Sequence, residues 1–259
     1  MKRRKKDLFI IGLLLMLVLA GGIASAATAH VKAAGSGTTS LDPPVQLVME
    51  QRGAAGLEEY RDGAAGKLLY PIVGALNTKP VDLGEYTLNL PSNENFVDCI
   101  VSADNQSSEE VYVRMLFAVP SALDGDEPKA LHVQVYDDTE QSAWEPPVKI
   151  SEGTLCAGVI CNVYSCKYKN TLPAGEKTPP VISGMYLDWK VDNDRDGYTL
   201  KGKKIDYDFA QGVKIPVAIQ AVQTDGQTDP FGSLGANPWD DTAATDAASV
   251  KLSVDRDVL

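Results

Sequence analysis

The sequence predicts an all-β protein: an antiparallel, jelly-roll-like β-sandwich with short helical or turn insertions, preceded by an N-terminal signal helix. Short segments rich in Val, Ile and Tyr recur along the chain, and Gly, Pro, Asn and Asp separate them. No long segment of the mature chain has the period of an amphipathic helix. Many short strands with frequent turns are typical of two packed antiparallel sheets.

Residues 1–26 have the pattern of a secretory signal peptide. Five cations at positions 2–6 precede an apolar stretch from Leu8 to Ala20, and the small residues Ala24–Ala26 follow. The apolar stretch is short for an uncleaved membrane anchor, the alternative interpretation, because a spanning helix needs roughly 20 residues. We therefore expect export, cleavage by signal peptidase, and a secreted, cell-surface-associated chain with no stable membrane insertion.

The charge of the chain argues against a nucleic-acid partner. The net charge is −11, and removing the five leader cations together with Asp7 lowers it to about −15. No basic run remains, whereas phosphate binding needs clustered cations. An acidic surface favours solubility and specifies no activity.

After a flexible linker over 27–43, the β-sandwich domain is expected over 44–240, with 241–259 as a C-terminal tail or last strand. Alternation and turn residues predict strands over 44–50, 67–73, 85–91, 95–103, 110–119, 130–137, 147–156, 159–169, 179–192 and 213–223. The strands 95–103 and 110–119 are expected to form a hairpin-like pair, and 147–156 is expected to turn into 159–169 at Ala157-Gly158.

The strand around Arg114 has one apolar face and one mixed face. Alternation places on the apolar face Val111, Val113, Met115 and Phe117, which we expect in the core. Tyr112 and Arg114 lie on the other face, where they are expected to meet solvent or a partner.

The cysteines are Cys99, Cys156, Cys161 and Cys166. In an oxidising compartment they would form two disulfides by any of three pairings, or they would remain as buried, inert thiols. Their spacing resembles no common zinc motif.

Residues 192–197, Asp-Asn-Asp-Arg-Asp-Gly, match the opening of a calcium-binding loop. Asp192, Asp194 and Asp196 occupy positions one, three and five, and Gly197 permits the tight turn. Position twelve, where a bidentate acid is expected, is Lys203. The alternative is an acidic hairpin turn with no bound metal.

The sequence gives no positive argument for an enzyme. The only histidines are His30 and His132, so no His-Glu-x-x-His pair exists, and no Gly-x-Ser-x-Gly elbow is present. Calcium is the one cofactor that the sequence suggests.

Four segments, taken in order, resemble the TasA/camelysin-like secreted proteins of Gram-positive bacteria. They are GKLLYPIVGAL (66–76), NFVDCIVSADNQSSEEVYVRMLFAVPSAL (95–123), NVYSCKYKNTLPAGEKTPPV (162–181) and VKIPVAIQAVQTDG (213–226). The resemblance implies a jelly-roll-like sandwich, export through a dedicated signal peptidase, and assembly with copies of itself or related subunits into biofilm-matrix fibres. It also implies that an N-terminal strand of one copy completes the sheet of the next. Residues 44–50, with Val45 and Leu47, are the candidate donor strand, and the alternative is that this chain has no donated strand.

Two alternatives remain. Camelysin-type relatives imply a secreted metalloendopeptidase, for which His132 would be the candidate ligand or base. The calcium-loop pattern and Trp144, Trp189 and Trp239, if these tryptophans are exposed, would instead suit a calcium-dependent surface adhesion or glycan-binding module.

Overall fold

The computed structural model describes residues 45–54, 56–60, 69–82, 87–125, 128–135, 143–156, 158–194, 197–209, 212–224, 230–232 and 249–252. The predicted leader and linker lie outside these ranges. In the ranges that are described, the fold is all-β, its strands pair antiparallel, and one short 3-10 turn is present, η1 (Ser121–Leu123). No helix in these ranges is long and apolar enough to cross a membrane.

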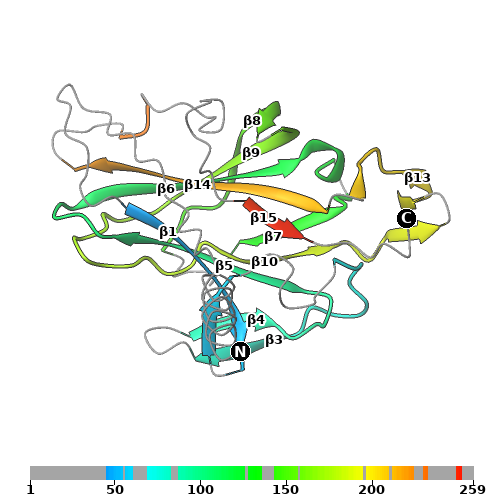
Figure 1. The fold of residues 1–259 in the computed structure, drawn as a ribbon, viewed down its shortest axis with the longest axis horizontal. Helices are drawn as coiled ribbons and strands as arrows, with labels where there is room; N and C mark the ends of the chain where they lie inside the picture. Colours follow the sequence, from blue (N-terminus) through cyan, green and yellow to red (C-terminus); the bar gives the residue numbers. More distant parts are fainter. Residues whose placement is uncertain are drawn as a thin grey trace, which may run out of the picture.

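Two five-stranded sheets form the body of the molecule. The first has the order β2 (Gly56–Glu59), β1 (Val45–Gly53), β5 (Val97–Asn105), β10 (Ile182–Leu187), β7 (Leu131–Val135). The second has the order β15 (Ser249–Leu252), β14 (Val213–Gln223), β6 (Val111–Pro120), β9 (Val159–Lys167), β8 (Val148–Cys156). In Figure 1, β6 and β14 cross the upper part of the view, and β5 and β10 lie below them.

Two smaller sheets flank this body. β3 (Thr78–Asp82) pairs with β4 (Thr87–Pro91), and β11 (Val191–Asp194) pairs with β12 (Gly197–Leu200), which also pairs with β13 (Lys203–Lys204). Buried Leu90 of β4 packs against Ile100 of β5, so the β3–β4 hairpin covers part of the first sheet's outer face. Arg52 ties the same region together, because its guanidinium donates to both Asp98 carboxylate oxygens at 2.6 Å.

The main core lies between the two large sheets. Val111, Val113, Met115 and Phe117 of β6 are all buried there, as strand alternation predicts, and they share one apolar cluster with Val45 and Leu47 of β1. Burial of this continuous apolar surface is the main force that holds the sheets together.

The predicted pairing of residues 95–103 with residues 110–119 is wrong. β5 pairs with β1 and β10 in the first sheet, whereas β6 pairs with β14 and β9 in the second. The connection between them therefore crosses from one sheet to the other. Asn105 stabilises this crossing, because its buried amide donates to the carbonyls of Glu109, Leu172 and Pro173 at 2.8 to 3.0 Å.

The predicted hairpin around Ala157-Gly158 is confirmed. β8 and β9 pair antiparallel, with Cys156 opposite Val159 and Leu155 opposite Ile160. Gly158 adopts φ 85°, a left-handed conformation that glycine accepts without strain. Residues 249–252 also form a strand that pairs with β14, at the position where the sequence left open a tail or a last strand.

Candidate functional site

One side of the sandwich ends in two edge strands, β7 in the first sheet and β8 in the second. Within the described ranges, no further strand pairs with the outer side of either one. An edge strand presents backbone N–H and C=O groups that another strand can bind. We refer to this side, with β7, β8 and the space between them, as the open side.

A cavity of about 230 Å³ lies on the open side, between β7 and the inner face of the second sheet. Most of its lining residues are apolar. The lining residues are Phe117, Val119, Asp124, Lys129, Leu131, His132, Val133, Val135, Pro147 and Tyr164.

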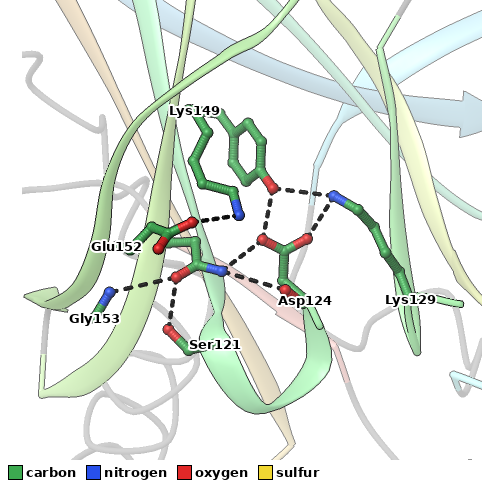
Figure 2. Close-up of polar contacts among 8 residues, drawn as sticks. Ser121, Asp124, Lys129, Lys149, Glu152 and Gly153 are labelled. Carbon is green, nitrogen blue, oxygen red and sulfur yellow. Dashed lines mark hydrogen bonds and ion pairs between the residues drawn. The ribbon is translucent and has the colours of Figure 1, made fainter. Parts of the chain in front are cut away.

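A polar cluster around Asp124 (Figure 2) contributes Asp124, Lys129 and Tyr164 to the lining of the cavity. Lys129 Nζ lies 2.6 Å from Asp124 Oδ1, while the Tyr164 hydroxyl donates to Asp124 Oδ2 at 2.6 Å. Asn162 Nδ2 donates to the same Oδ2 at 2.8 Å. Both carboxylate oxygens thus accept hydrogen bonds within the cluster. This arrangement suits an anchor that fixes η1 and the following loop to β9.

The cluster shifts the titration of two of its members. Burial raises the pKa of the Tyr164 phenol, and its hydrogen bond to Asp124 adds to that rise. Burial lowers the pKa of Lys129, but its hydrogen bonds and charge interactions with Asp124 and Tyr164 outweigh burial and raise the pKa overall. Lys129 is therefore held as a cation and Tyr164 as a neutral phenol. Neither is prepared to act as a general base near neutral pH.

His132 also borders the cavity, but its imidazole has a partner. Nε2 lies 2.9 Å from Asp188 Oδ2, and the ring stacks on Tyr186 with centroids 4.8 Å apart. Across the described part of the chain, no three His, Cys, Asp or Glu side chains gather as a metal site.

The tip of the β8–β9 hairpin carries an exposed apolar pair. Leu155 and Ile160 lie directly opposite each other and are 56% and 53% exposed. Alternation along β9 places Ile160 on the same face as Tyr164 and Cys166, the face that elsewhere packs against the first sheet. At the hairpin tip, this inner face is therefore left uncovered.

Arg114 does not face solvent as predicted. It is only 7% exposed; its Nε donates to Gln220 Oε1 at 2.5 Å, and its guanidinium lies 5.1 Å from the centre of the Phe231 ring. Tyr112 on the same face is partly buried against Val222 and Phe231. The expected solvent exposure is therefore wrong for Arg114, because Phe231 packs over this face, while a partner contact by Tyr112 or Arg114 stays a prediction.

Val45 and Leu47 are buried in the chain's own core. Their strand, β1, pairs with β5 along residues 45–50 and continues into a hairpin with β2. As a donor to another copy, β1 would first have to leave β5. In this structure Val45 and Leu47 are core residues and are not exposed interaction residues.

The proposed calcium-binding segment forms a β-hairpin in the residues that can be described. Asp192 pairs with Thr199 and Asp194 pairs with Gly197, while Asp196 lies outside the described residues. Calcium binding remains a prediction.

The tryptophans have different environments. Trp144 is buried, so it does not meet the condition of exposure that the adhesion or glycan-binding alternative sets, and its indole donates to the Pro179 carbonyl at 2.9 Å. Trp189 is 68% exposed, with Lys190 Nζ 5.3 Å from the ring centre. Trp239 lies outside the described residues.

Scans of this chain against protein-family models, curated proteins and solved structures return no match. The fold and the open side therefore define a class only: an all-β, sandwich-like protein in which, within the described ranges, β7 and β8 are edge strands.

Proposed function

We propose that this protein is a secreted structural subunit of an extracellular fibre or biofilm matrix. In this proposal a strand from another copy adds along β7, the edge of the first sheet. The protein acts through backbone hydrogen bonds at a sheet edge and not as an enzyme. Export by the predicted leader, a jelly-roll topology and kinship with TasA/camelysin-like proteins belong to the same proposal.

The observation that carries the proposal is the outer side of β7, with which no strand of the described ranges pairs and beside which the cavity lies. A strand added to β7 would extend the first sheet, satisfy the outward backbone groups of β7 and cover the cavity. We propose that the added copy also covers Leu155 and Ile160, the exposed apolar pair on the edge hairpin of the second sheet. Burying apolar area is worth roughly 25 cal/mol per Å², so covering this pair favours association.

The sheet order also supports growth in one direction. The first sheet ends in β7 on the open side and in β2 on the far side. A contact that joins different surfaces of two copies propagates as a filament when its rotation does not close a ring, and we propose that this is the case here. A second copy of this chain is the occupant we propose for the β7 edge.

The test is assembly of the mature chain, followed by electron microscopy and light scattering. The double variant Leu155→Lys/Ile160→Lys should stay monomeric, because two added charges oppose burial of the hairpin tip. Both residues are exposed, so we expect the variant to fold normally. The matched control is Val73→Lys, which changes an exposed apolar residue outside the two large sheets and should assemble like the unaltered chain. Filaments of normal length from the double variant would contradict the proposal.

The exposed ring of Trp189 favours a second candidate, a glycan-binding surface module. An exposed aromatic beside a cation can stack on a sugar face and orient its hydroxyls. Glycan-array binding that is lost in Trp189→Ala would support this candidate, and equal binding by the variant would remove it.

A further inference from the structure

The β8–β9 hairpin brings two of the four cysteines together. Cys156 lies opposite Val159, and Cys161 lies opposite Thr154; the Leu155–Ile160 pair lies between these two pairs, so the cysteines are diagonal neighbours on one face of the hairpin. Both are fully buried, and they pack in one small apolar cluster with Leu116, Ala118 and Val163 on the second sheet's outer face. The thiols are close enough for a hydrogen bond between them.

The other two cysteines lie elsewhere. Cys166 is five residues beyond Cys161 on the same strand, so strand alternation directs it to the opposite face of the sheet. Cys99 and Cys166 both belong to the core cluster between the two large sheets. Of the three two-disulfide pairings that the sequence left open, only one contains the Cys156–Cys161 bridge that this placement favours.

We infer that Cys156 and Cys161 form a disulfide that braces the β8–β9 hairpin, while Cys99 and Cys166 remain core thiols. The oxidant is a disulfide-bearing partner, either a thiol oxidoreductase or an oxidised small thiol. One cysteine thiolate attacks that disulfide and releases a thiol, and the second cysteine then attacks the mixed disulfide. Two protons leave the cysteines, their two electrons pass to the oxidant, and the oxidant ends as two thiols.

The disulfide between Cys156 and Cys161 is expected to form while the chain is folding, before the two thiols are buried. The hydrogen bond with Cys156, together with burial, raises the pKa of Cys161 far above that of an ordinary thiol, so little thiolate forms once the cluster has closed. The same burial shields the finished bond from reductants. This inference does not depend on whether the protein assembles.

The experiment refolds the reduced, full-length chain from denaturant in a mixture of oxidised and reduced glutathione. Remaining thiols are alkylated in denaturant, the disulfides are reduced, and the released thiols are labelled with a second, heavier reagent. A single tryptic peptide, residues 150–167, carries three of the cysteines, so chymotryptic cleavage after Tyr164 is needed to separate Cys166.

We expect the heavier, second reagent on Cys156 and Cys161, because it marks cysteines that were in a disulfide. The alkylating reagent used first, the first label, should be on Cys99 and Cys166, because it marks free thiols. The control variant Cys166→Ser should keep the bridge, whereas Cys161→Ser should lose it and leave Cys156 with the first label. The oxidised chain should also unfold at a higher urea concentration than the reduced chain. First label on Cys156 and Cys161, or a bridge involving Cys99 or Cys166, would overturn the inference.

Discussion

Asp124 and Tyr164 show how one buried carboxylate organises a polar part of the cavity lining. The Asp124 oxygens accept from Lys129, Tyr164 and Asn162, which come from a loop and from β9. A buried carboxylate is tolerated only when its lone pairs are used in this way. Sequence reasoning missed this group, because a short Asp-Gly-Asp segment after a strand looks like an ordinary turn.

The raised pKa of Tyr164 predicts a specific pH dependence of stability. The folded state holds the phenolic proton more tightly than the unfolded chain, whose tyrosine pKa is near 10.0. The stabilisation by Tyr164 is therefore complete below pH 10.0 and is lost as the pH rises through the higher folded-state pKa.

Tyr164→Phe should lower the free energy of unfolding by about 1 kcal/mol at neutral pH, the typical net value of one hydrogen bond. The difference between the unaltered chain and the variant should shrink above pH 10.0. Urea unfolding at several pH values measures both effects. Tyr112→Phe controls for losing a hydroxyl on the opposite face of β6 and β9. A difference that grows with pH would show that the sign is wrong.

Among the strands, β10 depends on close approach by a glycine. Gly184 lies where the register shifts against both β5 and β7. A Cβ atom at this position would lie 2.3 Å from the Val97 carbonyl oxygen and 2.5 Å from the Phe96 ring. Backbone cannot yield as easily as the end of a flexible side chain, so the strand pairing itself depends on glycine here.

Gly184→Ala should therefore destabilise the fold by about 3 kcal/mol, the upper range for an overpacked site. Gly125→Ala is the matched control, because a Cβ at Gly125 meets nothing within 4 Å. The urea concentration at the midpoint of unfolding is measured for both variants, and it should be lower for Gly184→Ala than for Gly125→Ala. Equal midpoints would mean that β10 relaxes without cost.

Alternation and turn residues predicted individual strands well and their partners less well. β1, β6, β14 and the β8–β9 hairpin lie where the pattern placed them. The pairing of β5 with β6 failed because sequence neighbours need not share a sheet, and a crossing between layers leaves no mark on alternation. Only the tertiary contacts of Asn105 reveal that crossing.

The candidate site was harder to predict for a related reason. Alternation gives the face on which Arg114 lies, but not what packs over that face, here Phe231. Exposed Leu155 and Ile160 look like core residues in the sequence, because a strand pattern cannot show that the opposite sheet ends at β7. An edge is a property of the whole sheet and not of any one segment.

At the scale of the molecule, the two large sheets end together on the open side, and a second copy is proposed to continue the first sheet there. Hydrogen exchange of the mature chain, before and after assembly, measures this most directly. The account predicts slower exchange in β7 (Leu131–Val135) on assembly, together with new protection of the hairpin tip around Leu155 and Ile160. Filaments in which β7 exchanges as fast as in the monomer, or a chain that never assembles, would contradict it.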